Sequence, residues 1–91
     1  MMKINFTKEF TKLYRKVDPK IRNAVAKRLE LFSENPLNPT LNNHPLTGNY
    51  QGYRSINVNG DWRAVYSESK MKNGEIVIIF KSLGTHSMLY K

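Results

Sequence analysis

Two Asn-Gly pairs in the second half of the chain restrict its fold more than any other feature. Asn59-Gly60 and Asn73-Gly74 lie next to segments rich in β-branched and aromatic residues. Asn and Gly both accept the positive φ of a type I′ turn, so each pair is a strong hairpin signal. We predict strands over 53–58 and 61–68, joined by a type I′ turn. The apolar run 75–80 favours a central strand buried on both faces.

The first third of the chain has helical rather than strand periodicity. Residues 2–6 alternate weakly and favour a short first strand, after which Thr7 is suited to cap a helix. Asp18-Pro19 ends this helix and begins a second, because Asp caps well and Pro suits the first helical position. The second helix is expected to end near Glu34. Apolar residues form one stripe on each helix: Phe10, Leu13, Tyr14 and Val17, then Ile21, Val25, Leu29 and Phe32.

These elements predict an α+β fold, in which two N-terminal helices pack on a small, twisted, mostly antiparallel sheet. With 91 residues, the chain is expected to form a single domain over 1–91. Residues 35–52 are rich in Asn, Pro, Gly and Thr and are expected to form a long loop from the helices to the sheet. Loops of this length in so small a domain are often functional.

The predicted hairpin register decides which side chains share a face of the sheet. A two-residue turn at Asn59-Gly60 places Arg54, Asp61 and Arg63 together on one face. The other face then holds Ser55, Asn57, Trp62, Ala64 and Tyr66. A single β-bulge would change this assignment.

The chain is strongly basic, and its charge favours a polyanionic partner. Its 15 Lys and Arg residues against 7 Asp and Glu give a formal charge of +8. Such an excess in a short domain is typical of proteins that bind nucleic acid or nucleoprotein particles. There is no long apolar run or signal peptide, so we expect a cytoplasmic protein without a membrane partner. The absence of cysteine excludes disulfides, Cys-ligated zinc and thiol nucleophiles.

Two histidines, His44 and His86, are the residues best suited to acid–base chemistry near neutral pH. The sequence holds too few potential ligands at recognisable spacing for a metal site, and it has no P-loop or dinucleotide motif. We therefore expect neither metal nor cofactor. Two histidines with clustered Arg and Lys suit RNA cleavage by internal attack of a 2′-hydroxyl. This reaction requires a base, an acid and cations for the phosphate.

Four motifs occur in an order and spacing that resemble a known superfamily. They are His44-Pro45-Leu46-Thr47-Gly48, Gly52-Tyr53-Arg54-Ser55, Gly60-Asp61-Trp62-Arg63-Ala64-Val65-Tyr66 and Gly84-Thr85-His86-Ser87-Met88-Leu89-Tyr90. Together they resemble the RelE/ParE toxins and, through the Gly-Thr-His-Ser segment, the YafQ branch of RelE-type mRNA interferases. The resemblance covers essentially the whole chain. It implies an endoribonuclease toxin that cuts mRNA in the ribosomal A site, and a cognate antitoxin that neutralises it.

The resemblance also implies a set of site residues. It assigns His44, Asp61, His86 and Tyr90 to catalysis, with Arg54 and Arg63 at phosphate-directed positions. Arg54 and Lys81 are expected to bind RNA, while Arg63 belongs with the catalytic set. YafQ-like proteins carry Asp and His where this chain has Ser55 and Asn57, so the proton transfers are left to the two histidines. RelE proper has lysine at the position of Ile56, so here the cations are expected to be Arg54, Arg63 or Lys81.

These residues suggest a mechanism and two alternatives. His44 is the better candidate for general base, with His86 as acid or as the group that polarises the phosphate, although the sequence leaves these roles interchangeable. Asp61 is expected to orient a histidine or a nucleobase, and Tyr90 to stack on a base. One alternative is a ParE-like toxin that binds DNA gyrase and hydrolyses nothing. The other is a non-catalytic RNA- or ribosome-binding module, which would need neither histidine.

Overall fold

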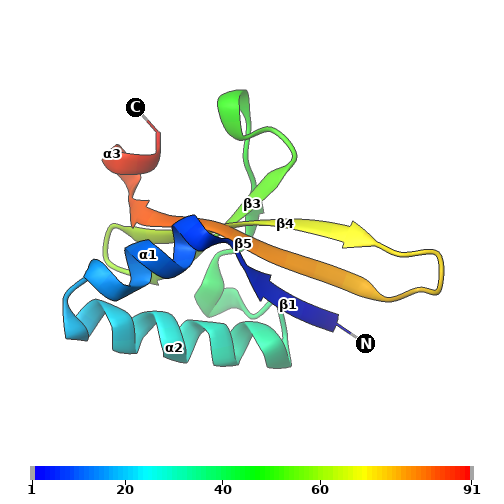
Figure 1. Cartoon of the computed structure of the whole chain (residues 1–91), viewed down its shortest axis with the longest axis horizontal. Coiled ribbons are helices and arrows are strands. Elements are labelled where there is room, and N and C mark those ends of the chain that lie inside the picture. Colours follow the sequence, from blue (N-terminus) through cyan, green and yellow to red (C-terminus); the bar gives the residue numbers. More distant parts are fainter. Residues whose placement is uncertain (1, 91) are drawn as a thin grey trace.

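Five strands form one twisted sheet with the order β1-β5-β4-β3-β2 in the computed structural model, which describes residues 2–90 (Figure 1). The strands are β1 (Met2–Phe6), β2 (His44–Pro45), β3 (Tyr53–Asn59), β4 (Trp62–Lys70) and β5 (Ile76–Thr85). β1 pairs with β5 in parallel, and the other three pairings are antiparallel. The mostly antiparallel α+β fold predicted from the sequence is confirmed.

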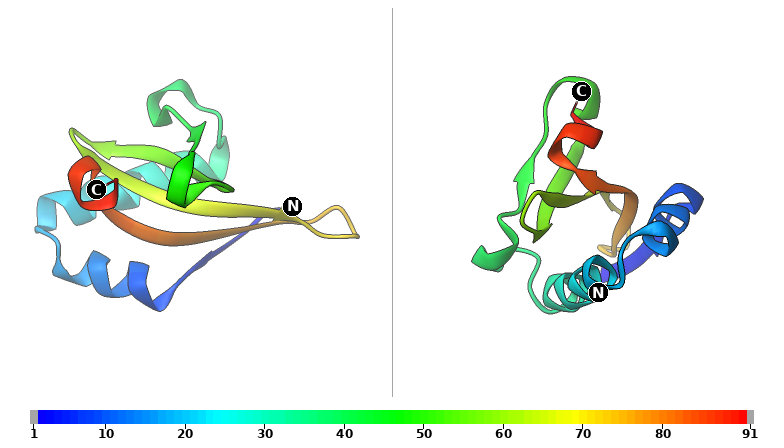
Figure 2. Two further views of the ribbon diagram at one scale, coloured as in Figure 1. Left: turned by 90° about the horizontal axis from the view of Figure 1, so that it is seen from above. Right: turned by 90° about the vertical axis from the view of Figure 1, so that its left-hand side faces the viewer.

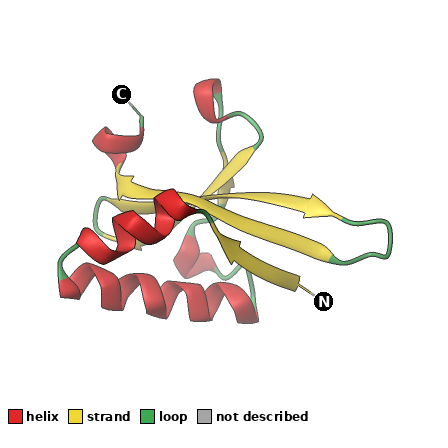
Figure 3. Ribbon diagram, in the orientation of Figure 1, coloured by secondary structure: helices red, strands yellow, loops and turns green. Residues whose placement is uncertain are grey.

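Two helices, α1 (Lys8–Lys16) and α2 (Pro19–Glu34), cover one face of the sheet (Figures 2 and 3). Both begin at the predicted caps. The hydroxyl of Thr7 accepts a hydrogen bond from the Phe10 N–H (3.0 Å), and a carboxylate oxygen of Asp18 accepts from the Lys20 N–H (2.8 Å). These bonds satisfy backbone donors that a helix start leaves open. No helix among residues 2–90 is long and apolar enough to cross a membrane.

The core between the helices and the sheet is built around four aromatic rings. Phe32 of α2 meets Tyr66 and Phe80 edge to face, with ring centroids 4.9 and 5.3 Å apart. Phe10 of α1 packs on Phe80 at 5.7 Å. All four side chains are at least 97% buried. Edge-to-face contacts of this kind add to the stabilisation that burial alone provides.

The turn between β3 and β4 differs from the prediction by one residue. Asn59 pairs with Trp62, so the turn residues are Gly60 and Asp61 rather than Asn59 and Gly60. Gly60 has a positive φ (52°), but Asn59 does not, because Asn42 is the only described non-glycine residue with a positive φ. A type I′ turn at Asn59-Gly60 is therefore wrong. The ladder then skips Val58, because Asn57 pairs with Arg63, and this break is a β-bulge.

The bulge at Val58 changes which side chains share a face of the sheet. Arg63 is opposite Asn57 instead of Ile56, and Arg54 is opposite Tyr66 instead of Val65. Arg54 therefore lies on the face that the helices cover, and Arg63 lies on the other face, which we call the outer face. The predicted grouping of Arg54 with Arg63 is wrong, because an unpaired residue reverses the alternation of every later pair.

Two further predictions need correction. Residues 35–52 are not a structureless loop, since they contain the edge strand β2 and two short 3-10 helices, η1 (Pro39–Leu41) and η2 (Gly48–Tyr50). The run 75–80 is not buried on both faces, because Ile79 on the outer face is 38% exposed. β5 extends to Thr85 and leads directly into a short helix, α3 (His86–Leu89).

Candidate active site

A cleft of about 370 Å³ lies on the outer face, where η2 and α3 stand on the opposite side of the sheet from α1 and α2 (Figure 1). It brings together four of the seven predicted site residues from distant parts of the sequence. Three of them have basic side chains: His44, Arg63 and His86. Its lining consists of His44, Pro45, Leu46, Thr47, Arg63, His86 and Tyr90. No carboxylate is in this lining, so Arg63 gives the cleft a positive charge.

His44 reaches the cleft because the two-residue strand β2 pairs with β3. His44 is opposite Ser55, so it lies on the outer face, on the same side as Arg63. Its Nδ1 lies 2.8 Å from the carbonyl oxygen of Asn42. A carbonyl can only accept, so Nδ1 must carry the proton, and Nε2 of the neutral ring is then an acceptor. This tautomer suits a general base.

The two residues that precede His44 and hold it in place, Asn42 and Asn43, were not singled out from the sequence. Asn42 has a left-handed backbone (φ 45°, ψ 47°), which turns the chain between η1 and β2. The Asn43 amide donates to the Tyr66 hydroxyl (2.6 Å) and to the Pro36 carbonyl (2.9 Å), and its oxygen accepts from Arg54 Nε (2.8 Å). Arg54, predicted to bind RNA, therefore anchors the start of β2 from the helix-covered side. Asn tolerates a left-handed backbone better than most residues, so the pair Asn42-Asn43 was the sequence signal that could have indicated this turn.

We expect Tyr66→Phe to make the free energy of unfolding less sensitive to alkaline pH. Burial raises the pKa of Tyr66 above its usual 10.0, outweighing the hydrogen bond from Asn43, which lowers it. The folded state therefore binds the phenolic proton more tightly than the unfolded chain does. The stability that this difference contributes is lost as pH rises above about 10, because the phenol of the unfolded chain ionises first.

The measurement is the free energy of unfolding by urea, from pH 8 upward. Tyr66→Phe is expected to be about 0.5–1.5 kcal/mol less stable than wild type at pH 8 through loss of the hydroxyl bond. The difference should narrow above about pH 10. A constant difference across this range would contradict the assignment. Tyr14→Phe, which changes a half-buried tyrosine outside this anchor, is the control.

Arg63 is held at the end of the sheet by its own turn. Its Nη1 donates to the carbonyl oxygens of Gly60 (2.8 Å) and Trp62 (3.0 Å). A guanidinium has five N–H donors, so these bonds leave those of Nε and Nη2 for a ligand. Paired N–H groups match the oxygens of a phosphate. Arg63 is the cation of the cleft that is best arranged to contact a phosphodiester.

His86 is the first residue of α3 and is positioned through its backbone. Its N–H donates to the Asp61 carbonyl (3.1 Å), which ties the helix to the β3–β4 turn. The Thr85 hydroxyl caps the same turn of helix by accepting from the Met88 N–H (3.3 Å). Asp61 is exposed and is not among the residues that line the cleft. Its observed contact with a histidine is thus made by the backbone rather than by the carboxylate.

A row of aromatic rings continues from His86 along the outer face. Tyr90 packs against His86 at 4.7 Å and against Tyr50 at 5.8 Å, and Tyr50 meets Tyr53 at 6.2 Å. The Lys81 ammonium lies 5.9 Å from the centre of the Tyr53 ring. Lys81, predicted to bind RNA, therefore lies at the far end of this row and does not line the cleft. Nothing in the sequence distinguished Tyr50 from the other tyrosines.

Two positions noted in the sequence, Ser55 and Asn57, lie beside the cleft residues. Ser55 is opposite His44, and Asn57 is opposite Arg63. Ser55 Oγ, Asn57 Oδ1 and the Tyr90 hydroxyl are buried and have no hydrogen-bond partner within the part of the chain that the structure describes. Buried polar atoms without partners are uncommon and often belong to functional sites. Ser55 and Asn57 thus add polarity beside the cleft, but neither side chain is an acid or a base near neutral pH.

Comparisons with known proteins find a matching family model and several similar solved structures. The family model described as "Bacterial toxin of type II toxin-antitoxin system, YafQ" matches residues 2–91. The mRNA interferase toxin YafQ of Escherichia coli is 34% identical over 55 residues. That stretch covers 60% of this chain and 54% of the relative, so the aligned part spans about half of the curated protein.

Several solved structures resemble the whole chain, including two from E. coli. Crystalline YafQ from E. coli superposes with a TM-score of 0.74 at 24% identity, with complete coverage of both chains, which shows the shared fold. A chain of the E. coli DinJ–YafQ toxin–antitoxin complex matches with a TM-score of 0.72 at 25% identity, covering 99% of this chain and 98% of the other. With the family model spanning almost every residue, the chain belongs to the YafQ family of bacterial type II toxin–antitoxin toxins.

Proposed function

We propose that this protein is an endoribonuclease toxin that cleaves mRNA on the ribosome without a metal ion. The observation that carries the proposal is the meeting of His44, Arg63 and His86 in one cleft, with Nδ1 of His44 bonded to the Asn42 carbonyl. The relative named an mRNA interferase supports the same activity. The proposal places the protein in the cytoplasm, where mRNA is translated.

In this mechanism the RNA supplies its own nucleophile. Nε2 of His44 takes the proton of a 2′-hydroxyl, and the 2′-oxygen attacks the adjacent phosphorus. Arg63 neutralises the charge that develops on the phosphorane oxygens. His86 donates a proton to the leaving 5′-oxygen, so the products are a 2′,3′-cyclic phosphate and a 5′-hydroxyl. We assign to Tyr90 the stacking of a nucleobase, because its ring lines the cleft and aromatic rings commonly hold unpaired RNA bases.

We also propose that a cognate antitoxin binds and neutralises the protein. The solved DinJ–YafQ complexes of E. coli supply the precedent for a partner of this kind. The match to the YafQ family favours the nuclease over the gyrase-binding alternative.

The deciding experiment is to map the 5′ ends of cellular mRNA after the toxin is induced. We expect new 5′-hydroxyl ends within translated reading frames, early arrest of translation and continued DNA replication. Co-expression with the antitoxin should suppress the new ends. Arrest of replication without new mRNA ends would refute the nuclease and favour gyrase binding.

A further inference from the structure

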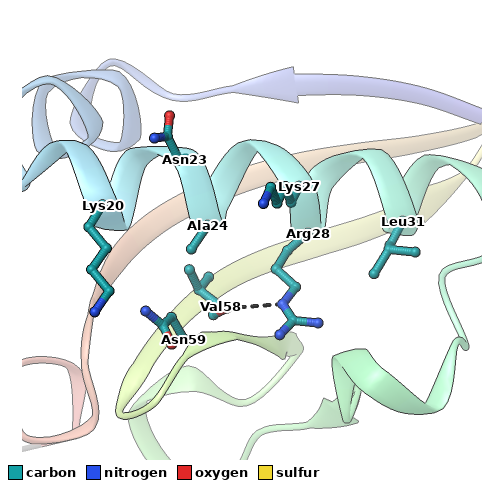
Figure 4. Close-up of a pocket in the computed structure, with 8 residues that line it drawn as sticks. All are labelled: Lys20, Asn23, Ala24, Lys27, Arg28, Leu31, Val58 and Asn59. Atoms are coloured by element: carbon teal, nitrogen blue, oxygen red, sulfur yellow. Dashed lines mark hydrogen bonds between the residues drawn. The ribbon is translucent and has the colours of Figure 1, made fainter.

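A second concave surface lies on the other side of the β3–β4 turn from the cleft. It is a groove of about 530 Å³ between α2 and the end of β3 (Figure 4). Its lining consists of Lys20, Asn23, Ala24, Lys27, Arg28, Leu31, Val58 and Asn59. None of these residues was predicted to be functional, and the cleavage mechanism uses none of them.

The charged groups of this groove are all cationic. Lys20, Lys27 and Arg28 contribute three positive charges, and no Asp or Glu is among the residues that line it. Arg28 is fixed, because its Nε donates to the Val58 carbonyl (3.0 Å), and Figure 4 shows its guanidinium directed toward β3. Lys20 and Lys27 are seven residues apart on α2, about 10.5 Å along the helix axis. The groove therefore presents a row of cations with one rigid member.

The lining also indicates which polyanion the groove suits. It contains no aromatic ring among the described residues, so it offers no platform on which unpaired bases can stack. The large exposed apolar side chains, which a docking protein segment would use as anchors, lie elsewhere: Phe6, Leu37, Met71, Ile79 and Met88. Cations and amides without such anchors suit a sugar–phosphate backbone whose bases are turned inward.

The groove and the cleft share one structural support. Asn59 lines the groove, while the carbonyls of the next two residues, Gly60 and Asp61, hold Arg63 and the backbone of His86. Ligands in the two sites would thus lie on either side of a single turn. We propose that the groove binds the phosphate backbone of double-helical RNA, as a second contact apart from the cleavage cleft.

The test measures how salt affects binding to a short, fluorescently labelled RNA duplex. A 2′-O-methyl duplex is used, because it has no 2′-hydroxyl to attack and stays intact with the wild-type protein. Lys20→Ala/Lys27→Ala removes two exposed cations from the groove. Lys70→Ala/Lys72→Ala, in the exposed β4–β5 hairpin, removes the same charge elsewhere. Each phosphate contact contributes about 0.9 to the slope of log affinity against log salt, by analogy with duplex DNA.

We expect the groove variant to bind roughly tenfold more weakly between about 50 and 200 mM salt, with a slope smaller by about 1 to 2. The hairpin variant should keep most of the wild-type slope. Equal weakening of both variants would show that only net charge matters and would overturn the proposal. Groove-dependent binding of polyglutamate without binding of the duplex would overturn it in favour of an acidic protein partner. Because the probe is not cleaved, the result stands independently of the proposed nuclease activity.

Discussion

Cleavage of translated mRNA by the His44→Asn protein is expected to be about 10²- to 10⁴-fold slower than by wild type, the range that general acid–base catalysis contributes. Asparagine keeps an N–H near the position of Nδ1, so it can still donate to the Asn42 carbonyl. It lacks Nε2, and with it the base. This substitution therefore separates the chemical role of His44 from its structural one.

His86→Ala is expected to slow cleavage by a similar factor, because it removes the proton donor for the 5′-oxygen. Initial rates on a defined message in a purified translation system are the measurement. Asn49→Ala, at an exposed position in η2, controls for effects of the surrounding segment. If His44→Asn and His86→Ala both cleave at the wild-type rate, the catalytic assignment is wrong. If only His44→Asn does, His44 has a structural role.

Phe32→Ala is expected to lower the free energy of unfolding by about 3–5 kcal/mol. Phe32 is fully buried, and its ring joins α2 to both Tyr66 and Phe80. The truncated side chain loses these contacts and leaves a cavity. The close-packed side chains around this cavity cannot readily shift to fill it. Domains of this size are commonly stable by only 5–15 kcal/mol, so this loss is a large share of the total.

Urea unfolding at neutral pH measures this effect. Leu37→Ala is the matched control, because Leu37 is 72% exposed and its truncation should change stability by no more than about 0.5 kcal/mol. A loss below about 1 kcal/mol for Phe32→Ala would show that the aromatic cluster is not the centre of the core.

The elements governed by local chemistry were predictable from the sequence. Thr7 and Asp18 cap their helices as expected, because an N-cap depends on a few adjacent residues. The strands β3, β4 and β5 were predicted from the Asn-Gly pairs and the apolar run 75–80, whereas the parallel pairing of β1 with β5 was not. Local signals of this kind do not depend on the rest of the fold, so they could be recognised from the sequence alone.

The arrangement of the candidate site was predictable only in part. His44, Arg63, His86 and Tyr90 line one cleft, whereas Arg54 lies on the other face of the sheet. The error in the face assignment came from the bulge, because an unpaired residue exchanges the faces of the residues before it, whereas moving the turn by one position would keep them. The bulge lets both Ile56 and Val58 be buried in the core, which is a matter of packing that the local sequence does not specify.

The bulge at Val58 also limits how this chain can change in length. Insertions and deletions are usually tolerated next to exposed turns. Here, however, loss of the unpaired residue Val58 would restore a regular ladder but would remove a buried core side chain and the carbonyl that accepts from Arg28. A segment that looks like a replaceable surface hairpin is thus fixed in length, and we expect it to vary by single substitutions rather than by insertions or deletions.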